Sequence, residues 1–164
     1  YYAARAVWDH NPNLVILGNP AATRRLPIFS MQIHDRQHGG MVHQQLFTRM
    51  LSDCYGIQAR GGCACASPYA HRLLGIDRTE SDALRAAILS GEEMRKPGWT
   101  RLNFSVLMDD AKAETIIAAV DELARAPYPM ADFYEADPAT ARFRAAAGRS
   151  SFSEEKEAKR LLSI

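Results

Sequence analysis

The sequence lacks the features that mark membrane proteins, secreted proteins and nucleic-acid-binding proteins. No apolar run reaches the roughly 20 residues of a membrane-spanning helix, and no signal-peptide pattern opens the chain. The formal net charge is only +1, which gives no general attraction to nucleic acid or to an anionic membrane. The three cysteines, two of them one residue apart, do not form the pattern of a secreted disulfide framework. We therefore expect a cytoplasmic protein without nucleic-acid or membrane partners.

What is present is typical of a globular domain. The chain has 164 residues, of which 47% are hydrophobic and 24% charged, enough to bury a sizeable core. An initiator methionine is missing, and residues 1–9 are typical of the end of a helix stopped by His10-Asn11-Pro12. We expect the chain to be part of a longer protein.

Apolar periodicity predicts a mixed fold. The predicted strands cover residues 13–18, 26–35, 57–60 and 100–108. The predicted helices cover residues 41–56, 68–74, 79–90 and 109–126, with Thr79 and Asp109 or Asp110 as N-caps. Gly56 suits a left-handed helix end. The sequence therefore predicts an α+β fold, in which a small, mostly antiparallel sheet is covered by helices.

The segment 100–108, TRLNFSVLM, gives the clearest strand signal. One face carries Leu102, Phe104 and Val106, and the other carries Arg101, Asn103 and Ser105. An arginine on a polar strand face is usually only solvated. If that face lines a cleft, Arg101 becomes a planar fork that suits a carboxylate.

The stretch ARGGCACASPY, residues 59–69, contains two of the three cysteines. Zinc is disfavoured, because Cys63 and Cys65 lack a second ligand pair and only His71 and His43 are available besides. A redox pair is disfavoured, because the usual spacing is Cys-x-x-Cys. Two interpretations stay open. The cysteines are small buried hydrophobes in a glycine turn, or one is a reactive thiol activated by Arg60 and a helix N-terminus.

Two motifs in this order resemble a known family. GIQARGGCACASP followed by GWTRLNFSVLMDDAKAETIIAAVDEL resembles the C-terminal small domain of class V aminotransferase-fold enzymes. These pyridoxal-phosphate proteins include cysteine desulfurases and selenocysteine lyases. The resemblance covers residues 14–126. It implies a small domain over 1–126, a large cofactor-binding domain upstream and a homodimeric whole enzyme. Residues 127–164 are not covered by the resemblance, and their prolines and glycine, followed by a capped pattern from Ser153, predict an extension with a terminal helix.

The resemblance also implies roles for individual residues. The desulfurase pattern Arg-x-Gly-x-x-Cys-Ala-x-Pro is matched from Arg60 to Pro68. It makes Cys65 the thiol that takes sulfur from the substrate and places Arg60 near that substrate. Arg101 matches the arginine that holds the α-carboxylate of an amino acid such as cysteine. The sequence departs from the family in an extra segment at about 77–96 and in Cys63, where the pattern often has histidine.

The cofactor itself needs a Schiff-base lysine. The chain has four lysines, Lys96, Lys112, Lys156 and Lys159, and none lies at the end of a predicted strand. We expect the main cofactor contacts upstream and this chain alone to be inactive. Two alternatives remain. One is an aminotransferase or another pyridoxal-phosphate lyase in which Cys65 has no role, and the other is a small metal-binding or scaffold domain.

Overall fold

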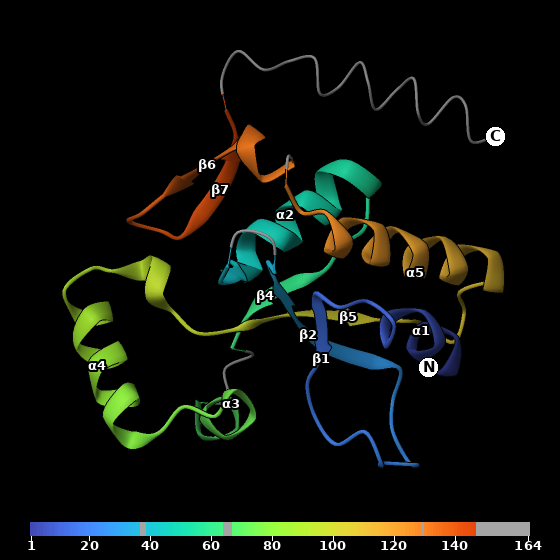
Figure 1. Ribbon diagram of the computed structural model, residues 1–164, viewed down its shortest axis with the longest axis horizontal. Coiled ribbons are helices and arrows are strands. Elements are labelled where there is room, and N and C mark those ends of the chain that lie inside the picture. Colours follow the sequence, from blue (N-terminus) through green and yellow to red (C-terminus); the bar gives the residue numbers. More distant parts are fainter. Residues whose placement is uncertain (37–38, 64–66, 129, 147–164) are drawn as a thin grey trace.

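The computed structural model describes residues 1–36, 39–63, 67–128 and 130–146, and Figure 1 shows their arrangement. In chain order the elements are α1 Tyr2–Trp8, β1 Leu14–Ile16, β2 Ile28–His34, β3 Met41–Val42, α2 Gln44–Tyr55, β4 Arg60–Gly62, α3 Ser67–Leu74, α4 Arg78–Leu89, the 3-10 helix η1 Glu93–Arg95, β5 Trp99–Asn103, α5 Asp110–Arg125, the 3-10 helix η2 Met130–Phe133, β6 Tyr134–Asp137 and β7 Arg142–Ala145. The predicted α+β class is confirmed. None of the helices in the described ranges is long and apolar enough to cross a membrane.

The main sheet has five strands and is antiparallel at every described pairing. Its order is β1-β2-β5-β4, and β3 pairs with the C-terminal end of β2. Burial alternates along β2 and so distinguishes the two faces of the sheet. Phe29, Met31 and Ile33 are buried on one face, and the residues between them are partly exposed on the other. Phe29 faces Leu102 across the ladder, so these side chains point to the same side.

One face of the sheet carries the core. Helices α1, α2 and α5 cover it, and α2 and α5 lie together on that side in Figure 1. The core residues come from these helices, from β1, β2, β3 and β5, from η2 and from the segment between α2 and β4. Among the described residues, α3 and α4 contribute none to this cluster, and Figure 1 shows them at the β4 end of the molecule. The described part of the chain therefore provides no comparable layer of helices over the opposite face.

Polar side chains tie the N-terminal segment to α5. Trp8 Nε1 donates to the carbonyl of Ile117 at 2.9 Å. Asn13 Nδ2 donates to the carbonyls of Ala124 and Arg125 at 3.0 and 3.1 Å. The last two carbonyl groups lie at the C-terminus of α5, where the helix itself leaves them unpaired. The contacts fix α1 and the start of β1 against the core.

Helix ends agree with several predictions. The Asp109 side chain accepts from the Lys112 N–H at 2.7 Å, which confirms it as the N-cap of α5. Gly56 has φ +64 and ends α2 in the left-handed conformation. The predicted cap Thr79 is wrong, because Asp77 caps α4 by accepting from the Glu80 N–H at 2.8 Å.

Three predicted boundaries are wrong. Met41 and Val42 belong to β3 and not to the following helix, because they pair with His34 and Ile33 of β2. The strand predicted over 57–60 lies at Arg60–Gly62. The strand predicted over 100–108 ends at Asn103, after which the side chain of Val106 is 95% exposed. In each case the local pattern fits two structures and tertiary pairing decides between them.

Residues beyond Pro127 form structure that was not predicted. Strands β6 and β7 make an antiparallel hairpin that packs against α2. The Tyr134 hydroxyl hydrogen-bonds the Asp53 carboxylate at 3.2 Å, and the rings of Phe143 and His43 lie 5.2 Å apart. The terminal helix predicted from Ser153 lies outside the described residues.

Candidate carboxylate-binding site

The two arginines singled out from the sequence are direct partners in the sheet. In the β4–β5 ladder Arg60 lies opposite Arg101, and Arg101 in turn lies opposite Ser30 of β2. Directly opposed residues of antiparallel strands share a face and have Cβ atoms about 4.5–5.5 Å apart. Arg60, Arg101 and Ser30 therefore form one row across three strands, on the face away from the core.

Buried neighbours hold this row in place. Thr100 and Leu102 flank Arg101 and are 1% and 3% exposed, so the strand cannot slip without removing them from the core. Arg101 itself is half-buried and Arg60 is exposed. The guanidinium groups thus stand on a fixed backbone at the edge of solvent.

The row has no countercharge of its own. Strands β2, β4 and β5 contain no aspartate or glutamate. Within the described part of the chain, neither arginine makes a side-chain hydrogen bond or an ion pair. Like charges directly opposed across a ladder are destabilising. The arrangement is therefore suited to an anion, and a planar carboxylate can pair with a guanidinium in bidentate fashion.

Glycines bring β4 close enough to β5 for this pairing. A Cβ atom on Gly98 would lie 2.8 Å from the Cα of Gly62, and one on Gly61 would lie 3.0 Å from the carbonyl oxygen of Gln44. Gly62 also has φ +124, which side chains rarely adopt. The glycines of the ARGG stretch and of PGW thus meet in space, which the sequence alone did not indicate.

The cysteine loop begins directly after this ladder. Cys63 follows Gly62 and is a half-buried free thiol. Cys65, the predicted sulfur acceptor, lies outside the described residues. Pro68 lies in the first turn of α3, as predicted. Cys63 is therefore three residues after Arg60 in the chain.

Metal ligation finds no support among the residues that the structure places. They contain no group of three or more His, Cys, Asp or Glu side chains that could hold a metal ion. His43, one of the possible ligands, instead caps α2, where its Nδ1 accepts from the Gln45 N–H at 3.2 Å. Burial lowers the pKa of His43, and the main chain of Met94 partly opposes this shift.

The described lysines do not fit a Schiff-base role. Lys96 donates to the Glu93 carboxylate at the surface. Lys112 is exposed in the first turn of α5, on the side of the sheet opposite to the arginines. Both described lysines therefore lie at the surface and away from the arginine row.

Comparison of the chain with protein-family models, with curated proteins and with solved structures gives no match. A function for the chain therefore has to be argued from its own residues and their arrangement.

Proposed function

We propose that this chain is the small domain of a pyridoxal-phosphate enzyme of the class V aminotransferase group. In this proposal its open sheet face binds the carboxylate of an amino-acid substrate. The observation that supports the proposal best is the pairing of Arg60 with Arg101 across the β4–β5 ladder. The resemblance had given both residues a place near the substrate, and their register makes them neighbours although they are distant in sequence.

Arg101 is the residue proposed to hold the carboxylate. Its position in the middle of the sheet, between buried Thr100 and Leu102, limits the motion of its backbone. A guanidinium group on a fixed backbone loses less conformational entropy on binding than one on a mobile backbone. Arg60, on the edge strand and more exposed, adds positive charge and orients the same anion.

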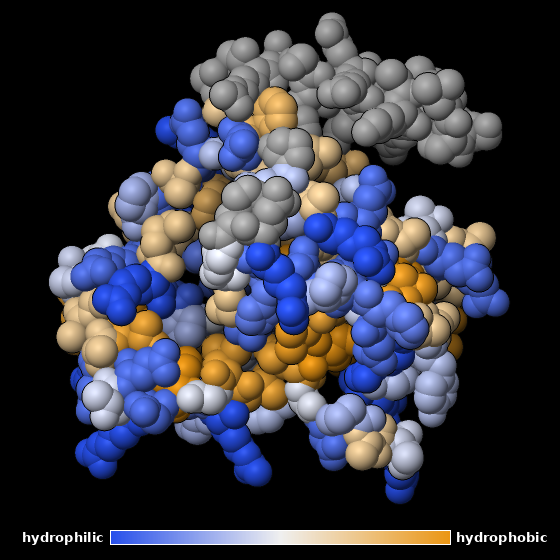
Figure 2. Space-filling view, viewed as in Figure 1, coloured by the Kyte–Doolittle hydropathy of each residue, from blue (hydrophilic) through white to orange (hydrophobic). Residues whose placement is uncertain are grey.

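The open face also has apolar positions that suit a covering domain. Val15 and Ile28 point to this side, since they pair with Gln32 and Asn103, and they are 39% and 37% exposed. Figure 2 shows apolar residues crossing the middle of the molecule, over the region where Figure 1 places β1 and β2. In the proposal, the large domain packs over this face and supplies the lysine that the described residues lack.

The reaction proposed for the whole enzyme is that of a cysteine desulfurase. Cys65, which the resemblance makes the thiol of the site, would accept the substrate's sulfur, and it follows the end of β4 by three residues. The test uses the longer protein that this proposal requires, incubated with cysteine while sulfide is measured. Arg101→Gln should raise the apparent KM for cysteine, and Cys65→Ala should abolish sulfide release. Unchanged sulfide release from Cys65→Ala would remove the thiol role, and dependence on a 2-oxo acid would favour an aminotransferase instead.

A further inference from the structure

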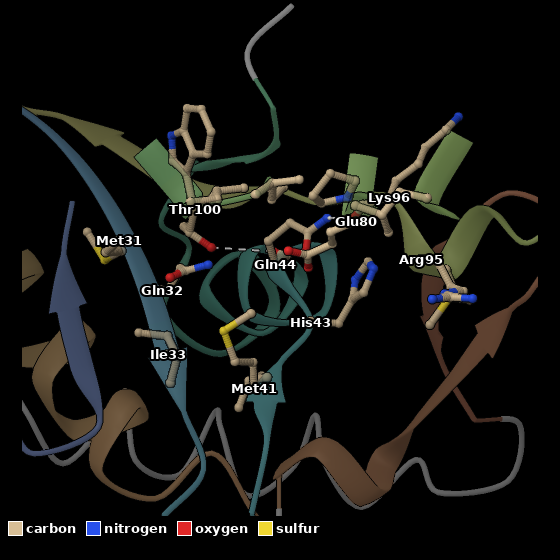
Figure 3. A pocket seen from close by; sticks show the side chains of 18 residues that line it. Met31, Gln32, Ile33, Met41, His43, Gln44, Glu80, Arg95, Lys96 and Thr100 are labelled. Carbon is tan, nitrogen blue, oxygen red and sulfur yellow. Dashed lines mark hydrogen bonds between the residues drawn. The ribbon is translucent and has the colours of Figure 1, made fainter. Parts of the chain in front are cut away.

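A groove of about 400 Å³ runs between α2, the segment that leads into β4, and β7. It differs from the cavity of about 300 Å³ beside the start of β5, which Figure 3 shows from close by. In that cavity polar groups bond to one another, since Thr100 Oγ1 donates to the Gln44 carbonyl and Gln44 Nε2 donates to the Lys96 carbonyl. We call the larger hollow the α2–β7 groove, and its lining includes Gln45, Thr48, Arg49 and Ser52 of α2 and Arg142 and Phe143 of β7.

Side-chain contacts hold the β6–β7 hairpin against α2, so the groove exists before anything binds. The Tyr134 hydroxyl hydrogen-bonds the Asp53 carboxylate at 3.2 Å, and the same carboxylate accepts from Arg49 Nε at 2.7 Å. The rings of Phe143 and His43 lie 5.2 Å apart. Figure 1 shows the hairpin beside α2. The proposed function gives this hairpin no role, since the resemblance ends at residue 126.

One wall of the groove is a free strand edge. The Ala146 N–H donates to the Phe133 carbonyl at 2.8 Å, in continuation of the β6–β7 register. Because hydrogen-bonded and non-hydrogen-bonded pairs alternate along an antiparallel ladder, Arg144 turns its main-chain groups toward β6, whereas Phe143 and Ala145 turn theirs outward. Within the described ranges no strand pairs with this outer edge of β7. Phe143 lines the groove and no residue of β6 does, so the free edge faces the groove.

The segment before β4 also brings main-chain groups to the groove. Ala59 lines it, and among the described residues neither its N–H nor its C=O takes part in a main-chain hydrogen bond. Unpaired strand edges are ready templates for another extended chain. A helical ligand would not use them, because its main-chain groups are bonded internally. The groove therefore suits an extended backbone.

Charge favours an acidic occupant. Arg49 and Arg142 line the groove, and no aspartate or glutamate does. Arg142 makes no ion pair within the part of the chain that the structure describes. Asp137 lies opposite Arg142 in the hairpin, but its carboxylate accepts from the Thr140 hydroxyl at 2.7 Å and from the Ala139 N–H at 3.0 Å. A carboxylate from an occupant can therefore pair with Arg142.

We propose that the α2–β7 groove binds an extended, acidic segment of a partner protein, which adds to the hairpin as a third strand along the free edge of β7. Main-chain hydrogen bonds to Phe143 and Ala145 supply the affinity, and pairing of a glutamate or aspartate with Arg142 supplies the preference for an acidic sequence. The hairpin gains in return, because two strands alone are marginally stable. Neither Arg60 nor Arg101 lines the groove, so this site and the carboxylate site can fail independently.

Amide hydrogen exchange on the full ¹⁵N-labelled chain tests the proposal, with acetyl-Thr-Glu-Val-Glu-Val-Thr-amide as the probe. The amides of Phe143 and Ala145 should exchange rapidly in the free chain, and the peptide should slow them in a saturable way. The same peptide with all its peptide nitrogens methylated should have no effect. Lysine in place of both glutamates should weaken binding about twofold to fivefold.

Three results would overturn the proposal. The first is the absence of saturable slowing, and the second is equal binding by the methylated or the lysine peptide. The third is protection of the Phe143 and Ala145 amides before any peptide is added. That protection would mean that the edge is already occupied, by a second copy if it depends on protein concentration and by the chain itself if it does not.

Matched variants locate the binding. Ala145→Pro removes an outward N–H of β7 and should weaken peptide binding about tenfold. Ala136→Pro makes the same change on the outer edge of β6, opposite Phe143, and should leave binding unchanged. Both alanines are exposed, and edge strands tolerate proline. Ser52→Trp fills the groove without altering the hairpin, with Ala118→Trp at an exposed position of α5 as its control. If Ala145→Pro disrupts the hairpin, Ser52→Trp decides, and unchanged peptide binding in that variant contradicts the site.

Discussion

Arg60 and Arg101 are directly opposed in the antiparallel ladder between β4 and β5, and neither of these strands nor the neighbouring β2 contains an acidic residue. This relationship gives the chain a fixed pair of positive charges on the face of the sheet that the core helices leave free. Glycine packing between β4 and β5 and the buried neighbours of Arg101 both maintain it.

The opposed arginines should repel one another when no anion is bound. Arg60→Gln is expected to raise the free energy of unfolding by about 0.2–1 kcal/mol at low ionic strength, because it removes a like-charge pair across the ladder. Urea denaturation measures the change. Arg24→Gln is the matched control, since Arg24 is exposed and has no ion pair within the described ranges. The same gain from Arg24→Gln would show that only net charge matters.

Gly98 should be required for the arginine row to form. In Gly98→Ala the new methyl group meets the backbone of Gly62, and we expect a loss of about 1–3 kcal/mol in unfolding free energy together with weaker β4–β5 pairing. Amide hydrogen exchange across β4 and β5 measures the pairing. Gly18→Ala is strained by its φ of +109 but has no atom within 4 Å, so it should lose stability without faster exchange in β4. Protected β4 amides in Gly98→Ala would contradict this account.

Asn13 should stabilise the end of α5. Asn13→Ala removes two hydrogen bonds to helix carbonyls and is expected to cost about 1–3 kcal/mol. Asn103→Ala provides the control, because Asn103 is exposed at the end of β5 and should change stability by less than about 0.5 kcal/mol. Thermal and urea unfolding compare the two variants, and similar effects from both would argue against the capping role.

His43 should make stability depend on pH. Burial lowers its pKa in the folded chain below the value of about 6.5 in an unfolded one, so the unfolded chain binds more protons between the two values. The free energy of unfolding should therefore fall as the pH drops below about 6.5, and His43 contributes nothing to the slope above about 7.5. Urea unfolding at about pH 7.5 and about pH 5.5 measures the difference.

The variant His43→Asn isolates that contribution. Asparagine still caps α2 but does not titrate, so part of the pH dependence should disappear. His10→Asn is the control, because His10 is exposed at the end of α1. An unchanged pH dependence in His43→Asn, or an equal change in His10→Asn, would show that His43 is not the group responsible.

Local pattern predicted much of the fold and part of the site. Alternation located β2 and β5, and the Asp109 cap located α5, because both signals depend on neighbours in the chain. The placement of Met41 and Val42 in β3 depends on their pairing with β2. The apolar residues that follow recur at helical spacing, so the sequence alone predicted that the helix begins at residue 41. The hairpin after Pro127 was missed because its strands are short and polar.

The arrangement of the site depended on distant contacts. Arg60 and Arg101 were each identified from the sequence, but their register comes from the packing of Gly98 on Gly62. A cavity beside the start of β5 was not predicted at all, since its lining residues come from segments that lie far apart in the sequence.

The central claim is that Arg60 and Arg101 together bind a carboxylate, and one titration tests it most directly. The ¹⁵N-labelled chain is titrated with propionate, and with propionamide as the uncharged control, while the arginine Nε–H resonances are followed. We expect a saturable shift of the Arg101 resonance with propionate alone, lost in Arg60→Gln and retained in Arg142→Gln, which alters an exposed arginine on β7. A propionate response that is equal at Arg101 and Arg142, or that survives Arg60→Gln unchanged, would contradict the claim.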